Sequence, residues 1–195
     1  DSTEVTIPES VTKIGASAFE KAQIQKIIIP PEVTEIGEKA FQNSSLEVVE
    51  FSGDNNVAVI GTEAFSGCRK LTRFSFSEKL TEIKARTFEY CEKMSGELNL
   101  PSRLTEIGDS AFSSCKGLNG KLILQEGITR IGSGAFQWCE NLTGELKLPS
   151  GLTEIGDSAF YGCSRFTGDL TIPSGITEIK YGTFASCSGF DGKLN

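Results

Sequence analysis

The sequence predicts an α/β solenoid of about eight stacked coils, each 22–24 residues long, with short parallel β-strands and short helical or 3-10 turns. The first observation is a repeated sequence: residues 104–112 and residues 152–160 both read LTEIGDSAF. A phenylalanine marks the same place in each unit, and an isoleucine lies five positions before it. The phenylalanines are Phe19, Phe41, Phe65, Phe88, Phe112, Phe136, Phe160 and Phe184. Such a period is the signature of stacked repeats.

One unit contains the pieces of one coil. Residues 144–149 read GELKLP, whose alternation predicts a short half-buried strand that ends at proline, which cannot donate to a sheet. The alternation of LTEI at 152–155 predicts a second extended segment. The following GDSAF breaks the alternation, and a glycine followed by Asp and Ser predicts a tight turn that enters a helical or 3-10 turn. No segment buries an apolar face alone, so the coils must stack.

Stacking in register places equivalent residues in rows. We expect the Phe row, the Ile row and two strand rows to point inward and form one continuous core. The strand rows are Val5, Ile27, Val49, Phe74, Leu98, Leu122, Leu146 and Leu170, and, two residues on, Ile7, Ile29, Phe51, Phe76, Leu100, Leu124, Leu148 and Ile172.

The six cysteines form one further row. They are Cys68, Cys91, Cys115, Cys139, Cys163 and Cys187, each three residues after a repeat Phe. Stacked neighbours lie about 4.8 Å apart, which is within disulfide range, so free thiols and inter-coil disulfides both remain open. Free buried thiols are favoured because pairing would break the symmetry of the row, and cysteine packs as a small hydrophobe.

Composition excludes several classes of partner. The net charge is −7 with scattered Lys and Arg, which argues against nucleic acid and against an anionic membrane surface. No run of apolar residues is long enough for membrane insertion. We expect residues 1–195 to form a single solenoid domain and a monomer, and because both ends interrupt a repeat, we expect a piece of a longer chain.

No catalytic, cofactor or metal site is predicted. The chain has no histidine, and no phosphate-binding loop occurs. One slot of the repeat carries Glu35, Glu82, Glu106, Glu154 and Glu178, with Lys13 and Arg130 as exceptions. Such a row is a solvated outer face or a divalent-cation site, and the first interpretation is favoured. We therefore predict no enzyme.

Outward strand positions are the candidate binding site, because there the repeats stop agreeing. The candidates are Glu97, Asn99, Lys121, Ile123, Glu145, Lys147, Asp169 and Thr171. The alternating charges of Glu97, Lys121 and Glu145 indicate either cross-strand pairing or a polar recognition strip. The aromatic residues Tyr90, Trp138 and Tyr161, in the turns between Phe and Cys, form a second candidate patch.

The whole unit, LPSGLTEIGDSAFYGCSRFTGDLTIP at 148–173, resembles the leucine-rich repeats of the BspA-like, or Treponema pallidum-type, bacterial surface proteins. The resemblance implies a right-handed leucine-rich repeat solenoid in a cell-surface or secreted protein. Some members of that family are adhesins that bind host matrix proteins or other bacteria. We therefore expect an adhesin-like module that binds a protein or glycan, with host extracellular matrix among the candidates. The alternative is a rigid spacer that presents another domain.

Overall fold

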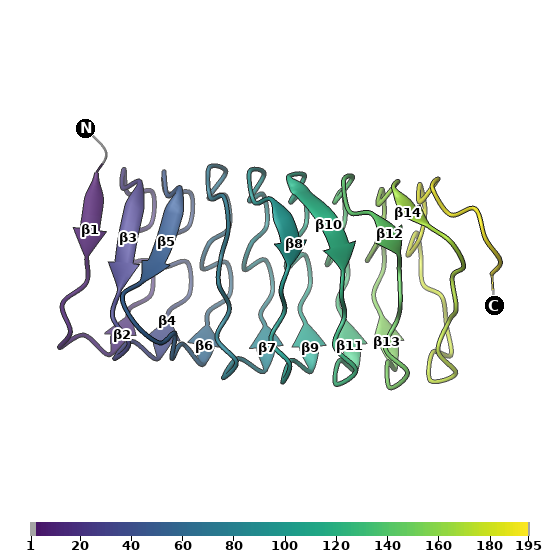
Figure 1. Cartoon of the computed structure of the whole chain (residues 1–195), viewed down its shortest axis with the longest axis horizontal. Coiled ribbons are helices and arrows are strands. Elements are labelled where there is room, and N and C mark those ends of the chain that lie inside the picture. The colour runs from purple at the N-terminus through teal and green to yellow at the C-terminus, as the bar shows by residue number, and fades with distance from the viewer. Residues whose placement is uncertain (1–2, 195) are drawn as a thin grey trace.

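The computed structural model describes residues 3–194, which form an elongated stack of coils with the chain ends at opposite ends of the stack (Figure 1). Each coil contributes to two strand faces, and all strand pairs are parallel. Between residues 3 and 194 there is no helix long and apolar enough to cross a membrane.

The first strand face comes from the GELKLP-type segments. Its strands are β1 (Glu4–Thr6), β3 (Lys26–Ile29), β5 (Val48–Phe51), β8 (Gly96–Leu98), β10 (Leu118–Leu122), β12 (Gly144–Glu145) and β14 (Phe166–Thr167). They pair in three separate groups, β1-β3-β5, β8-β10 and β12-β14. The face is therefore interrupted, whereas the repeat alone predicts a continuous one.

The second strand face comes from the LTEI-type segments, in strands of two residues each. They are β2 (Lys13–Ile14), β4 (Glu35–Ile36), β6 (Val59–Ile60), β7 (Glu82–Ile83), β9 (Glu106–Ile107), β11 (Arg130–Ile131) and β13 (Glu154–Ile155). The structure thus has about seven turns, and the predicted eighth coil is not confirmed. At its expected strand Ile179 is 56% exposed, because this last unit packs on a coil at one side only.

The predicted short helical or 3-10 turns are wrong, and the fold is a parallel β-solenoid: no helix occurs between residues 3 and 194. Ser110 and Ser114 have φ angles of 53° and 60°, and the left-handed region breaks a right-handed helix. Backbone donors also alternate between coils. The N–H of Ser110 donates to the next coil, at Ser133 O (2.8 Å), while that of Ala111 donates within its own coil, to Gly108 O (3.2 Å).

The predicted inward rows are confirmed through the middle of the stack, whereas Ile179 in the last unit is exposed and Phe19 and Phe184 at the two ends are half-buried. The repeat phenylalanines from Phe41 to Phe160 are fully buried, and their rings stack in an unbroken column. The ring centroids of Phe112 and Phe136 lie 5.5 Å apart with 9° between planes, and those of Phe136 and Phe160 lie 5.5 Å apart with 6°. Uniform packing of this kind explains why the sequence repeats so closely.

The cysteines are free thiols in one row, as the sequence favours, and all are buried except Cys187, which is half-buried. Each donates its S–H to the carbonyl of the repeat Phe one coil earlier, as Cys139 does to Phe112 O at 3.1 Å. Burial raises the pKa of Cys68 to about 11, and it likewise raises the pKa of Cys187 to about 11. These thiols are therefore protonated and unreactive at neutral pH.

Candidate binding surface

All eight predicted residues are exposed on the first strand face. Glu97, Lys121 and Glu145 lie in β8, β10 and β12. Asn99 and Ile123 directly follow β8 and β10, whereas the other three, Lys147, Asp169 and Thr171, lie two to four residues beyond the ends of β12 and β14. The structure brings six of the eight into two adjoining grooves and places Glu97 and Asn99 in a third groove of about 300 Å³.

Groove A has a volume of about 410 Å³ and lies mainly between the coils of residues 145–150 and 169–174, with Glu126 of the preceding coil at its edge. Its polar lining is Glu126, Glu145, Lys147, Ser150, Asp169, Thr171 and Ser174, and its apolar lining is Leu146, Leu148 and Pro173. Groove B, of about 330 Å³, is lined by Lys121, Leu122, Ile123, Leu124, Glu126, Glu145 and Lys147. Because Glu126, Glu145 and Lys147 line both, the grooves form one depression that crosses three coils.

Two carboxylates of this depression have partners inside the protein. Glu126 accepts hydrogen bonds from the backbone N–H of Ser150 at 3.2 Å and from its hydroxyl at 3.1 Å. Asp169 accepts one from the backbone N–H of Lys193 at 2.7 Å. Both carboxylates therefore use part of their hydrogen-bonding capacity inside the protein, while each keeps its negative charge.

The predicted charge pairing between coils does not form at Lys121. No ion pair within residues 3–194 joins Lys121 to Glu97 or Glu145; instead Glu145 pairs with Lys147 of its own coil, at 3.4 Å. Charge pairing between coils does occur in the three-stranded group β1-β3-β5, where Lys26 of β3 forms ion pairs with Glu4 of β1 and Glu50 of β5. The ammonium group of Lys121 is thus available to a partner.

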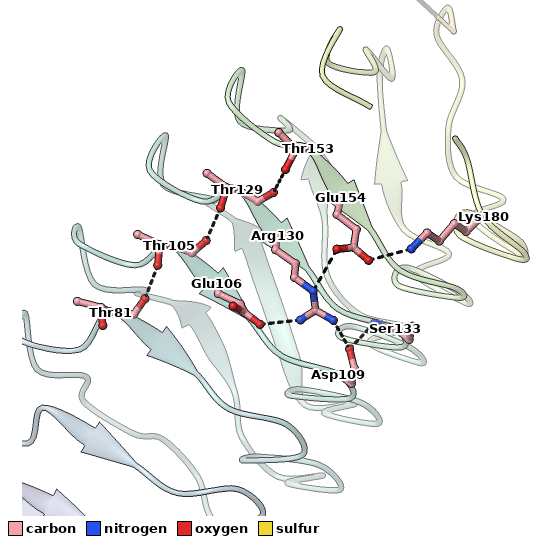
Figure 2. Close-up of polar contacts among 10 residues, drawn as sticks. All are labelled: Thr81, Thr105, Glu106, Asp109, Thr129, Arg130, Ser133, Thr153, Glu154 and Lys180. Atoms are coloured by element: carbon pink, nitrogen blue, oxygen red, sulfur yellow. Dashed lines mark hydrogen bonds and ion pairs between the residues drawn. The ribbon is translucent and has the colours of Figure 1, made fainter. Parts of the chain in front are cut away.

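The glutamate row lies on the second strand face and forms a charge cluster around Arg130 (Figure 2). Arg130 contacts Glu106 at 2.6 Å, Asp109 at 3.0 Å and Glu154 at 3.3 Å, and Lys180 pairs with Glu154 at 2.8 Å. A single arginine thereby joins three consecutive coils. Among residues 3–194 no group of three or more acidic or cysteine side chains is arranged to hold a metal ion.

The cluster alters the protonation equilibria of its members. Desolvation opposes the charged form of Arg130, but hydrogen bonds to Asp109 and Glu106 outweigh it and raise its pKa. The hydrogen bond from Lys180 lowers the pKa of Glu154 and raises that of Lys180. These exposed ion pairs join the charged side chains of neighbouring coils, each at the small energy typical of a solvent-exposed pair.

A threonine ladder runs beside this cluster (Figure 2). The hydroxyls of Thr105, Thr129 and Thr153 each donate to the backbone carbonyl of the threonine one coil earlier, at 3.0, 3.4 and 3.1 Å. The inward rows and outward candidates predicted from the sequence do not include this ladder, although its signal is a threonine that follows Leu, Ile or Val in every unit except the third, where Ala58 takes its place.

The aromatic patch on the turns is partly a packing feature. Trp138 and Tyr90 are 40% and 42% exposed, but Trp138 makes an edge-to-face contact with Tyr161 of the next coil, with centroids 4.8 Å apart. The guanidinium of Arg69 lies over the Tyr90 ring at 5.6 Å. These contacts join neighbouring coils, so exposure alone does not indicate a binding site here.

Comparison with known proteins agrees with this architecture. The pattern of the family described as "BspA type Leucine rich repeat region" matches residues 1–119 and 119–191, in six copies. No curated protein matches the chain.

Three solved structures share the fold. A T. pallidum leucine-rich repeat protein is 24% identical with a TM-score of 0.76, and the match covers 98% of this chain and 85% of that one. A leucine-rich cell surface protein from Faecalibacterium prausnitzii is 25% identical with a TM-score of 0.64 over 98% of this chain, which spans 59% of its length. A leucine-rich repeat protein from Eubacterium ventriosum is 24% identical with a TM-score of 0.70 over 92% of this chain, which spans 45% of its length.

Proposed function

This chain belongs to the BspA-type leucine-rich repeat family, and from that premise we propose that it is an adhesin-like binding module whose first strand face recognises a protein or glycan. The observation that carries the proposal is the depression formed by grooves A and B. Its polar side chains differ from coil to coil and are exposed, whereas the rest of each coil repeats for packing.

The proposed location is the cell surface or the extracellular space. Support comes from the family and from the F. prausnitzii protein, which is described as a cell surface protein. Because the thiols are free and buried, the fold does not depend on disulfide formation, and it is therefore compatible with both the reducing conditions inside a cell and the oxidising conditions outside it.

The candidate contacts are the eight exposed residues of the first strand face. Lys121 and Lys147 are the most informative of them because they are cations on a chain of net charge −7, and Lys121 has no ion pair within residues 3–194. Reversing both charges changes the depression without touching the core.

The test is binding of the purified chain to immobilised fibronectin, fibrinogen, laminin and mucin at physiological salt. We expect saturable binding to at least one of them, weakened at least tenfold in the double variant Lys121→Glu/Lys147→Glu. The matched control is Lys70→Glu/Lys116→Glu, which makes the same change in net charge at exposed lysines away from the grooves. Equal weakening in both variants would show nonspecific electrostatics and contradict the proposal.

The second candidate function is a rigid spacer, which the unbroken phenylalanine column favours. The stack is tied by ring stacking between all successive repeat phenylalanines, by the hydrogen bonds of six thiols and by threonine hydrogen bonds between several coils, and such ties resist bending. Absence of binding to the whole panel would favour the spacer over the adhesive module.

A further inference from the structure

We infer that the first strand face binds the same face of a second copy of this chain, with the two stacks antiparallel. This inference rests on the proposed function, that this face is a binding surface, and it names a protein partner for it. The observation that carries it is a row of charged side chains that point outward, directly before the first inward strand row. The charge alternates from coil to coil in the middle of the stack, where the row is Arg73, Glu97, Lys121 and Glu145.

The charges of this row are exposed and are not neutralised by one another. Among residues 3–194, Arg73, Glu97 and Lys121 form no ion pair. Glu145 pairs with Lys147 through its Oε2 atom, at 3.4 Å, which leaves Oε1 for another donor. The row therefore presents a regular charge pattern to a partner.

Glycines of the neighbouring coils hold these side chains in place. A Cβ atom on Gly120 would lie 2.7 Å from Cγ of Glu97, and a Cβ atom on Gly144 would lie 3.2 Å from Cγ of Lys121. The stems of Glu97 and Lys121 thus lean the same way along the stack, each over the glycine of the following coil. Side chains that are already ordered lose less conformational entropy on binding.

The alternating row is complementary to itself when it is reversed. A two-fold axis parallel to the strands, midway between β8 and β10, sets Glu97 of each copy opposite Lys121 of the other. The same axis sets Arg73 of each copy opposite Glu145 of the other. Both pairs occur twice in such a symmetric interface, and every cation of the central row faces an anion.

Other arrangements of the two copies are less favourable. An axis through a strand sets its residue of the row against itself, and an axis along the stack does so for the whole row. Moving the two-fold axis by one coil toward the C-terminal end sets Glu97 against Asp169. Moving it by one coil toward the N-terminal end sets Lys121 against the apolar Val48. The charge pattern therefore selects one antiparallel register.

The outer part of the row is compatible with this register. There the axis sets Val48 opposite Asp169, and Lys26 opposite Lys193. Lys26 is already paired with two glutamates. Lys193 of one copy therefore meets a group of net negative charge on the other.

The neighbouring outward row brings no like charges together. Two residues further along each segment, this row is Ser75, Asn99, Ile123 and Lys147. The axis sets Asn99 opposite Ile123 and Ser75 opposite Lys147. Ile123, which is 53% exposed, then becomes covered, and its burial adds to the ion pairs.

The overlap is small, so the association should be weak. About eight segments in overlap, at about 4.8 Å spacing and with about 10 Å of exposed length each, cover about 400 Å² per copy. Stable complexes bury about twice that area per partner. We therefore expect monomers in dilute solution and pairing at high concentration, or where many copies are displayed together on a surface.

The experiment is sedimentation velocity of the full chain at low and at physiological salt, at concentrations up to about 1 mM. The sedimentation coefficient of the wild type should rise with concentration, and should rise less at the higher salt. Lys121→Glu and Glu97→Lys should each weaken association at least tenfold, while the control Lys70→Glu leaves it unchanged. An equimolar mixture of the two single variants, and the double variant Glu97→Lys/Lys121→Glu, should associate again, because opposite charges then face each other.

Several outcomes would overturn the inference. A sedimentation coefficient of the wild type that does not rise with concentration excludes the pair. Stronger association of Glu97→Lys than of wild type would show that general repulsion between acidic chains controls association, and a double variant as weak as the single ones would refute the register. If the chain stays monomeric but binds a panel protein through Lys121 and Lys147, only this inference falls. If both tests fail, the proposed function falls with it.

Discussion

Replacing Phe136 by alanine tests the phenylalanine column directly. The ring is fully buried and is stacked between Phe112 and Phe160, with centroids 5.5 Å from each. Removing it opens a cavity in the middle of the solenoid and breaks two ring contacts. Because each coil contacts only its neighbours, the loss falls on two coil interfaces.

The magnitude follows from burial and from these two contacts. Truncating a buried phenylalanine costs about 3–5 kcal/mol, and the lost ring pairs, at about 0.5–1.5 kcal/mol each, place this site in the upper part of that range. For a chain of this size, about 2–4 °C per kcal/mol converts this to a fall of roughly 6–20 °C in the melting temperature. Phe19, which is half-buried and stacks on Phe41 alone among the repeat rings, should lose clearly less.

The assay is thermal and urea unfolding followed by circular dichroism, for Phe136→Ala, Phe19→Ala and the surface control Gln137→Ala. We expect the order of destabilisation to be Phe136 first, Phe19 second and Gln137 last. Equal midpoints for Phe136→Ala and Gln137→Ala would refute the inward column. A cost at Phe19 as large as that at Phe136 would refute the nearest-neighbour account.

Four further predictions concern other parts of the coil. Gly132→Ala should destabilise the protein more than Gly134→Ala in urea unfolding. A Cβ at position 132 would lie 2.5 Å from the backbone N of Asp109, whereas a Cβ at position 134 comes no nearer than 3.3 Å to a side-chain atom and adds mainly the strain of a φ of 62°. The reverse order would refute the backbone clash. Arg130→Gln should cost about 1 kcal/mol or less at low salt, and a cost that does not shrink with added salt would show a role beyond ion pairing. Thiol titration should count six free thiols in denaturant and almost none in the native protein, and fewer than six would indicate disulfides. Because Lys180 lowers the pKa of Glu154, stability from this pair is present above the ordinary glutamate pKa and is lost as the pH falls through the lowered one. The difference in urea midpoint between wild type and Lys180→Gln should therefore be seen at pH 7 and shrink steadily as the solution is acidified below the ordinary glutamate pKa.

The repeat determines much of this fold by itself. Every coil must fill the same slice of core, so burial imposes the same Phe, Ile and Cys at the same place, and these rows can be identified from the sequence. Phe136 and Cys139 are inward for that reason. The exposed positions of the first strand face, such as Lys121 and Lys147, could also be identified, because a side chain next to a buried one on a strand points the other way.

The turns could not be predicted in the same way. The stretch GDSAF is compatible with a helical turn or with a left-handed turn, and local preference does not separate the two. The neighbouring coil decides between the two conformations, because its backbone carbonyls accept hydrogen bonds from every second N–H group of the turn, as Ser133 O does from the N–H of Ser110. Those acceptors exist only once the coils are stacked.

The grooves likewise required the tertiary structure. The segments around Ile28 and Ile123 have similar patterns, yet one pairs with its neighbour and the other does not. Pairing depends on the relative path of two coils, including the shift in register between β8 and β10, and no single segment specifies it. The sequence by itself determined which residues face inward, through burial that is the same in every coil. The tertiary structure decided where neighbouring strands part, because that depends on how one coil fits against the next.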